Sequence, residues 1–320
     1  MKSSLVITVF NEEKTVGSLL RSLANQTIEP DEIIFVDGGS ADNTVVKIKK
    51  SKLKNQNYKS KIKIYVKPGL SIAAGRNFGI KKAKNKIIAM TDAGCVAHQD
   101  WLEKITKPFK DPLLGMVAGF YRMTGRTAFQ QAVAPYLGTL PEKLDPASFL
   151  PSARSMAFRK NVWEKVGGFK EKLERAGEDT LFNYQAKKAG AKFVTAADAL
   201  VDWEMPKTLG EAVKKFSIYA KGDAQAGIWW HPSQRAFTHN LKIAAIYLRY
   251  LVGSLFLLAG FYQPTFWRVL FLGFSGYLIW IILKNFKYLR EKRAFVWLPI
   301  LQVVSDLAVM AGFASGVVIK

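Results

Sequence analysis

The chain has 320 residues, 49% of them hydrophobic, so it can bury a full core and need not be a single soluble domain. Its 47 basic and 25 acidic residues give a formal net charge of +22, which indicates an anionic partner such as nucleic acid, anionic lipid or a nucleotide diphosphate. The single cysteine, Cys95, excludes an internal disulfide and fits a reducing compartment. The apolar run at the start is too short for a signal peptide, which predicts a cytosolic N-terminal part.

Short apolar runs alternate with longer amphipathic stretches over the first two hundred residues. The pattern predicts helices at 12–25 and 71–84, another helix after Ser40, and strands at 5–10, 32–36, 62–66 and 87–90. Alternation of this size is typical of an α/β fold with a mostly parallel sheet and right-handed crossovers. Beyond Gly115 the pattern becomes irregular until a short helix at 160–166.

Acidic residues stand where the predicted strands end. Asp37 closes the second strand, Asp92 follows the fourth, and the pair Glu178-Asp179 opens a later helix. Ligands of an open α/β sheet bind beyond the carboxyl ends of its strands. We therefore expect the first two acids to line one crevice, suited to ribose hydroxyls and to a metal on a diphosphate. The third acid is placed to supply a general base, and the layout predicts an enzyme that handles a sugar nucleotide.

Three long apolar segments follow residue 240, at 243–262, 265–283 and 294–319. Each is long enough to cross a bilayer whose hydrocarbon core is ~30 Å thick. The loop 284–293 between the second and third segments holds five basic residues, and the positive-inside rule places it in the cytosol. Three spans then predict an integral membrane protein with a cytosolic N-terminal domain and a C-terminus on the outer side.

Arg249 and Asp306 lie within the first and third apolar segments. An ionised group in hydrocarbon is costly unless it is paired or hydrated, so we expect these two spans to pack together. Arg249 would pair with Asp306 or turn toward the phosphate of a lipid acceptor; alternatively it snorkels to the surface and Asp306 is protonated and alone. Gly312-x-x-x-Gly316 would let another helix approach closely. Residues 209–230 predict an amphipathic helix, either at the membrane surface or packed on the N-terminal domain.

The motifs resemble those of family-2 glycosyltransferases of the GT-A fold, inverting enzymes that use sugar nucleotides. The resemblance covers roughly residues 4–230 and rests on blocks in the expected order, among them ITVFNEEKTVGSLLRSL, EIIFVDGGSADNT, AAGRNFGIKKAKNKIIAMTDAGC, SARSMAFRKNVWEKVGGF and GEDTLFNYQAKKAG. It implies a GT-A nucleotide-binding domain at 1–205. An amphipathic interface segment at 206–240 and an all-α transmembrane region of three helices at 241–320 would follow.

The resemblance also implies nucleotide-sugar-binding residues. Phe10, Asn11 and Glu12 at the end of the first strand would border the base and ribose, and Asp37 would contact the base. The alternative for Asp37 is a turn-forming aspartate before two glycines. Arg76 would approach the nucleotide, where a guanidinium pairs with phosphate oxygens; the alternative is a surface arginine on a helix.

The family resemblance makes Asp179 the catalytic base, with Glu178 beside it. The alternative for Asp179 is a helix N-cap, and both roles are compatible. The family's DxD motif has an acid where this sequence has Gly94, which leaves Asp92 alone at the metal site. A bound Mg²⁺ or Mn²⁺ would then use Asp92, diphosphate oxygens and water. His231 is a possible further ligand, although a lone histidine is more often structural.

The implied function is inverting transfer from a nucleotide sugar to a lipid-linked or glycan acceptor at the cytosolic membrane face, in polysaccharide or glycolipid biosynthesis. A UDP-linked donor is favoured, and a GDP- or dTDP-linked donor is the alternative. The QxxRW motif of processive synthases has no match here, which favours one transfer per encounter. Gly94 motivates a second reading, a degenerate non-catalytic sugar-nucleotide-binding membrane protein.

Two other classes of protein fit less well. A dinucleotide-binding dehydrogenase is disfavoured because FNEEKT stands where its glycine-rich fingerprint would be. We expect membrane lipid and no nucleic acid as a partner, because few aromatic residues interleave with the lysines of 47–67.

Overall fold

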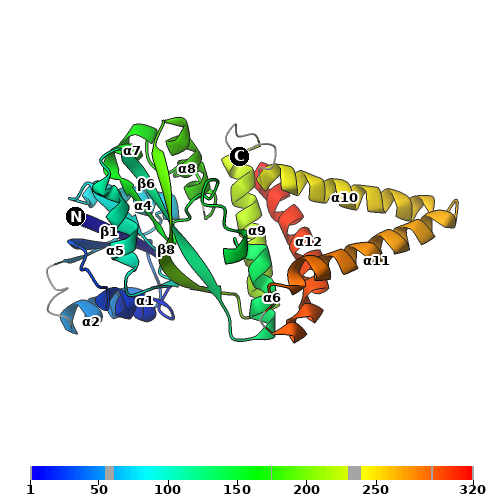
Figure 1. The fold of residues 1–320 in the computed structure, drawn as a ribbon, viewed down its shortest axis with the longest axis horizontal. Coiled ribbons are helices and arrows are strands. Elements are labelled where there is room, and N and C mark those ends of the chain that lie inside the picture. The colour runs from blue at the N-terminus through cyan, green and yellow to red at the C-terminus, as the bar shows by residue number, and fades with distance from the viewer. Residues whose placement is uncertain (1, 55–60, 174, 230–238, 290, 319–320) are drawn as a thin grey trace. The chain divides into compact units, whose positions relative to one another are not determined.

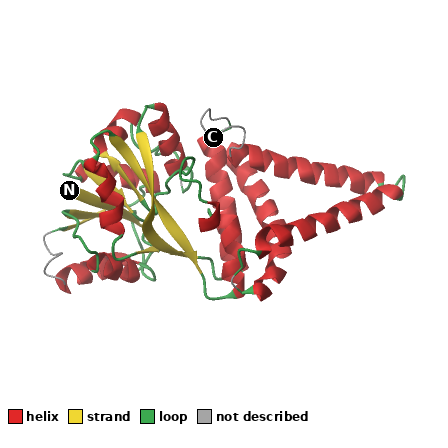
Figure 2. Cartoon of the chain, viewed as in Figure 1, coloured by secondary structure: helices red, strands yellow, loops and turns green. Residues whose placement is uncertain are grey.

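A computed structural model describes residues 2–54, 61–173, 175–229, 239–289 and 291–318. The chain divides into two compact units (Figures 1 and 2). The first comprises Met1–Met123 and Pro141–Glu204, and the second comprises Thr124–Leu140 and Met205–Lys320.

The first unit is built on one eight-stranded sheet with the strand order β3-β2-β1-β4-β7-β6-β8-β5. The strands are β1 Ser3–Val9, β2 Glu32–Asp37, β3 Ile62–Val66, β4 Ile87–Met90, β5 Cys95–Ala97, β6 Leu114–Thr124, β7 Met156–Arg159 and β8 Lys192–Glu204. The four strands predicted from the sequence are β1 to β4, and they form the parallel part.

The sheet as a whole is mixed, because β7 pairs antiparallel with both β4 and β6, and β5 pairs antiparallel with β8. The sequence beyond Gly115 looked irregular for a physical reason. Every residue of β6 from Leu114 to Tyr121 is buried, so the strand shows no alternation of apolar and polar residues. The prediction of a parallel sheet therefore holds for the half that carries Asp37 and Asp92.

The described helices of the first unit are α1 Val16–Ala24, α2 Thr44–Lys54, α4 Ile72–Lys82, α5 Trp101–Thr106, α7 Lys160–Val166 and α8 Glu178–Lys188, with short 3₁₀ turns at Lys107–Lys110 and Pro141–Lys143. Helix α4 begins at the capping residue Ser71, whose hydroxyl accepts from the backbone N–H of Ala74 at 3.2 Å. Gly75 and Gly79 let α4 lie close against the parallel strands, because a Cβ at either position would press on side chains of β1. This contact fixes the position of Arg76.

The second unit is helical. Its described elements are α6 Ala128–Leu137, α9 Leu209–Ala226, α10 His239–Ala259, α11 Thr265–Phe286, a 3₁₀ turn at Lys292–Val296 and α12 Trp297–Val318. Among the described residues, α10, α11 and the segment Lys292–Val318 are long and apolar enough to cross a membrane, by length and composition. They coincide with the three apolar segments of the sequence.

Helix α12 lies between the other helices of this unit. The predicted pair of Arg249 and Asp306 is confirmed, with 2.5 Å between Nη2 and Oδ2. Gly312 and Gly316 do admit a close helix, and that helix is α9. The apolar face of α9, which includes the buried Ala212, Phe216 and Ala220, faces protein here. The surface helix expected at 209–230 is therefore partly covered by α12.

Candidate active site

Three elements of the first unit meet at one buried guanidinium. Arg76 of α4 is 2% exposed, so it is not the surface arginine of the alternative interpretation. Its Nη2 donates to Oδ1 of Asp92, just beyond β4, at 3.0 Å, and its Nη1 donates to Oε1 of Glu178 at the start of α8. The fold thus joins two of the acidic positions that the sequence singled out.

The charges in this cluster stabilise one another. Burial opposes the ionised form of Arg76, but the carboxylates of Glu178, Asp92 and Asp179 outweigh it, and the pKa of the guanidinium is raised. Burial raises the pKa of Glu178, while the attraction of Arg76 acts in the opposite direction. Within the described part of the chain, Nε of Arg76 and Oε2 of Glu178 are buried without a hydrogen-bond partner.

Asp179 is the second residue of α8 and is partly exposed. Its carboxylate accepts from the backbone N–H of Ala153 at 3.1 Å and from that of Thr180 at 2.7 Å. The alternative role of Asp179 as a helix N-cap is not present, because the N-cap of α8 is Gly177, whose φ of 85° is left-handed.

Asp37 is fully buried and organises the turn after β2. Its Oδ1 accepts from the backbone N–H groups of Gly39 and Ser40, both at 2.9 Å, and its Oδ2 accepts from the Ser40 hydroxyl at 2.5 Å. The turn-forming role weighed for this residue is therefore present, and contact with a nucleotide base stays a prediction.

Phe10, Asn11 and Glu12 follow β1 at the same edge of the sheet. Phe10 is 53% exposed, and Asn11 has a φ of 55°, in a region that non-glycine residues seldom occupy. The backbone N–H of Asn11 donates to the Ser40 hydroxyl, and that of Glu12 donates to Thr44 Oγ1. These bonds tie the end of β1 to the turn after β2, so the predicted base and ribose positions lie together.

The predicted metal position rests on Asp92. Its side chain is 29% exposed, and Arg76 engages only Oδ1, so Oδ2 remains available. At Gly94 an added Cβ would meet nothing within 4 Å. No group of three or more His, Cys, Asp or Glu side chains suited to a metal occurs among the described residues, and His231 lies outside them. This donor set fits an ion held mainly by a donor diphosphate, with Asp92 as one protein ligand.

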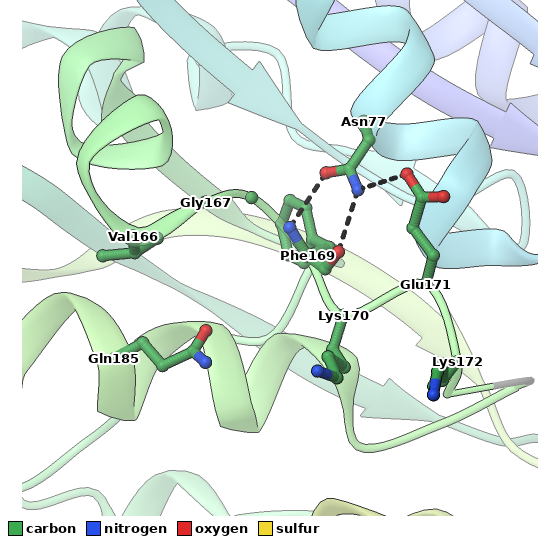
Figure 3. A pocket seen from close by; sticks show the side chains of 9 residues that line it. Asn77, Val166, Gly167, Phe169, Lys170, Glu171, Lys172 and Gln185 are labelled. Atoms are coloured by element: carbon green, nitrogen blue, oxygen red, sulfur yellow. Dashed lines mark hydrogen bonds between the residues drawn. The ribbon is translucent and has the colours of Figure 1, made fainter.

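Asn77, directly after Arg76, is a buried residue that sequence reasoning missed. Its Oδ1 accepts from Trp163 Nε1. Figure 3 shows its other bonds: Oδ1 also accepts from the backbone N–H of Phe169, and Nδ2 donates to the Phe169 carbonyl and to Glu171. These bonds hold the loop after α7 against α4. Beside them lies a pocket lined by Asn77, Gln185 and residues 166–172.

Arg154 is a second residue that the sequence did not single out. It follows Ala153, the residue whose N–H binds Asp179. Its guanidinium stacks on Trp203 of β8 at 3.8 Å from the ring centroid. The sequence signal that could have identified Arg154 is its position in the block SARSMAFRKNVWEKVGGF, one of the blocks that carry the family resemblance.

Comparison with protein families gives a match to the model of glycosyl transferase family 2 over residues 4–166. Glycosyltransferase AglE of Haloferax volcanii is 27% identical over 265 residues, which cover 79% of this chain and 81% of that protein. The O-antigen chain rhamnosyltransferase RfbN of Salmonella typhimurium is 29% identical over 216 residues, covering 63% of this chain and 66% of its own length.

Solved structures share the fold. The mannosyltransferase PcManGT from Pyrobaculum calidifontis, in complex with GDP-Man and Mn²⁺, has a TM-score of 0.70 at 16% identity, over 98% of this chain and 87% of its own. GalNAc-T7 with UDP, GalNAc and Mn²⁺ has a TM-score of 0.54 at 17% identity, over 73% of this chain and 49% of its own. At these identities the likeness concerns the fold alone.

Proposed function

Because the chain belongs to glycosyl transferase family 2 and is therefore a glycosyltransferase, we propose that it transfers a sugar from a nucleotide-sugar donor with inversion at the anomeric carbon. The observation that carries the proposal is the cluster in which Arg76 binds Asp92 and Glu178, with Asp179 next in sequence. It brings the acid at the end of a parallel strand together with the acids that open α8.

Asp179 is the base in this mechanism. The acceptor hydroxyl attacks the anomeric carbon, the bond from that carbon to the donor phosphate breaks, and the nucleotide diphosphate leaves with the bonding electrons. Asp179 takes the hydroxyl proton. Its carboxylate is suited to this role because two backbone amides hold it in place while the side chain stays partly open to solvent.

Arg76 acts as a positioning residue. Asp92 and Glu178 engage one nitrogen each at the end of its guanidinium, and the side chain is buried. It therefore orients the two carboxylates, and the contact with the nucleotide that the family resemblance implies stays a prediction. Phe10, Asn11, Glu12 and Asp37 would border the base and ribose.

A divalent ion, Mg²⁺ or Mn²⁺, would neutralise the charge that develops on the leaving diphosphate. Asp92 would hold it together with diphosphate oxygens of the donor. The free Oδ2 of Asp92 supports this assignment, as does the presence of Mn²⁺ with two structural neighbours. Loss of transfer in EDTA and its recovery with Mg²⁺ or Mn²⁺ is the expected result. Full activity in chelator would contradict a metal role.

The donor and acceptor are assigned by class. Two neighbours are described with GDP-Man and with UDP, which supports a nucleotide sugar, and we favour a UDP-linked one. Helices long enough to cross a membrane support a lipid-linked or glycan acceptor at the cytosolic face, with one transfer per encounter. A panel of UDP-, GDP- and dTDP-sugars, with release of nucleotide diphosphate as the readout, identifies the donor.

Replacement of the base tests the mechanism. Asp179→Asn is expected to lower turnover by ~10²–10⁴-fold, the usual contribution of general-base catalysis, and to leave donor binding nearly unchanged. Turnover follows from initial rates of transfer, and donor binding from calorimetry. Asp198→Asn is the matched control, because that carboxylate is 68% exposed on β8. Near-normal turnover of Asp179→Asn would remove Asp179 from the mechanism.

The donor panel also tests the alternative function. If the native chain binds donors but releases nucleotide diphosphate from none of them, the non-catalytic alternative motivated by Gly94 is favoured.

A further inference from the structure

We propose that only α10 and α11 cross the membrane, and that α12 lies along the membrane surface on the side of the glycosyltransferase domain. There α12 forms a helical layer with α6 and α9, and its outer face contacts lipid. The inference rests on contacts within the second unit and does not depend on the proposed donor, acceptor or base.

Helix α9 occupies one side of α12 at backbone distance. A Cβ added at Gly312 would overlap the backbone of Ser217, and one added at Gly316 would overlap that of Lys221. The two contacts advance by four residues in each helix, so α9 and α12 run in the same direction. This packing leaves no room for lipid between them.

Helix α9 is not suited to the bilayer interior. Its 18 residues include five acidic or basic side chains, Glu211, Lys214, Lys215, Lys221 and Asp223. If α12 crossed the bilayer, the backbone contacts at Gly312 and Gly316 would carry these charges into hydrocarbon, where ionised groups are costly. A position of both helices along the surface keeps the charged residues of α9 near water.

Helix α6 covers another part of α12. The Tyr136 hydroxyl donates to the Leu298 carbonyl at 2.9 Å, and the rings of Phe129 and Trp297 meet edge to face at 5.2 Å. With 10 residues, α6 is too short to span a bilayer, which takes about 20. The amino-terminal half of α12 is therefore also packed on a helix that does not cross the membrane.

Helices α10 and α11 differ from α12 in how little of their surface protein covers, although α11 and α12 have the same length and mean hydropathy. In their most apolar windows only 6% of residues are buried, against 33% for the segment that contains α12. At 1.5 Å per residue their 21 and 22 residues are about 32 and 33 Å long, which matches the hydrocarbon core. Figure 1 shows them leading away from α12 and converging at the turn before Thr265, where Tyr262 is 92% exposed.

A polar cluster joins the middle of α10 and the middle of α11 to α12. Asp306 accepts from Arg249 of α10, from the Tyr277 hydroxyl of α11 at 3.0 Å and from Gln302 of α12 at 2.9 Å. Arg249 is thereby paired, and its charge is not left alone beside lipid, where an unpaired ion is costly.

The outer face of α12 is apolar and exposed. Ile300 is 46% exposed, Leu307 is 51% exposed and Val317 is 48% exposed. Helices α6 and α9 cover other parts of α12. Lys292 and Arg293 precede the helix at a position suited to lipid headgroups. Membrane lipid is the occupant that this face fits, because it continues the apolar surface of the hairpin. The C-terminus then lies on the side of the N-terminal domain, opposite to the prediction from three spans.

Single-cysteine labelling of the full chain tests the arrangement. In a Cys95→Ser background, three variants each carry one reporter: Leu113→Cys in the first unit, Tyr262→Cys at the hairpin turn and Val318→Cys at the end of α12. Leu113 is 67% exposed and Val318 is 84% exposed. Sealed vesicles of known orientation are treated with a membrane-impermeant maleimide, before and after permeabilisation.

We expect positions 113 and 318 to react from one side and position 262 from the other. Reaction of position 318 from the side of 262 would overturn the proposal, because α12 would then cross. Reaction of all three from one side would also overturn it, because the hairpin would not cross. Reporter fusions to the C-terminus of the unsubstituted chain give the side of residue 320 without any cysteine variant.

Discussion

At the scale of single residues, the most consequential one is Arg76, whose guanidinium is shared by carboxylates from two elements. Glu178 is 102 positions away in the sequence, and Asp92 is 16 away. Removing one partner of a buried ion pair leaves the other charge buried and uncompensated. The cluster therefore couples stability of the fold to the geometry of the site.

Substitution of this arginine separates the two effects. Arg76→Met is expected to destabilise the first unit by about 3–5 kcal/mol, because Glu178 stays buried without its partner. The double variant Arg76→Met/Glu178→Gln should lose less stability, because it leaves no buried charge at position 178. The unfolding temperature of the purified protein measures both. Arg122→Met is the control, because its pair with Asp202 is 46% exposed on the arginine side and is expected to contribute at most about 1 kcal/mol. Equal losses in the single and double variants would contradict an ion-pair role.

Gly94 allows the metal site to be rebuilt. Since a side chain at this position meets no neighbour within 4 Å, Gly94→Asp is expected to fold normally and to place a second carboxylate near Asp92. An exposed charge contributes up to about 1 kcal/mol, so the Mn²⁺ concentration for half-maximal transfer should fall about fivefold. Gly210→Asp, at another uncrowded glycine, is the control. An unchanged metal requirement would argue against an ion beside Asp92.

The sequence located the ends of the parallel strands, because short buried strands have a local signal. Asp37 is the last residue of β2 and Asp92 follows β4, as expected, while their roles toward a donor stay predictions. The pairing of Arg76 with Glu178 was not foreseen, because α8 is brought to α4 by tertiary packing that leaves no periodic signal. Asn77 escaped for the same reason, since its partners follow α7.

At the scale of elements, the parallel strands and the apolar helices were predictable, whereas few of the contacts between helices were. The length of the apolar segments identified α10, α11 and α12. The cost of an unpaired charge among apolar residues predicted the pair of Arg249 with Asp306. The small residues Gly312 and Gly316 predicted that another helix packs closely on α12, but they did not indicate which helix. The partner is α9, whose amphipathic pattern fits lipid and protein equally well.

The contact of α9 with α12 can be weighed by adding one methyl group. Gly312→Ala is expected to destabilise the second unit by about 1–3 kcal/mol, the usual cost of overpacking, because its Cβ would overlap the backbone of Ser217. Gly273→Ala on α11 adds the same group where no atom lies within 4 Å, and should be neutral or slightly stabilising. Thermal unfolding in detergent compares the two. Equal stability would mean that α9 and α12 separate readily.

At the scale of the whole molecule, the protein carries a formal charge of +22, and its proposed donor, a nucleotide sugar, is an anion. A field of this sign raises the local concentration of anions and speeds their association. The effect acts on the encounter with the donor and not on the chemical step, since Asp179 and the Arg76 cluster are held by short-range bonds.

Salt therefore provides a test at this scale. Between about 0.01 and 1 M salt the Debye length falls from ~30 to ~3 Å, which screens a long-range field. The ratio kcat/KM for the donor is expected to fall by about tenfold over that range, while kcat changes little. The double variant Lys49→Glu/Lys50→Glu replaces a positive by a negative charge at each position and lowers the net charge from +22 to +18. The dependence of its kcat/KM on salt should therefore be shallower. Both lysines are exposed on α2 and can be replaced without disturbing the core. A kcat/KM that does not change with salt in either protein would mean that the net charge plays no part in donor capture.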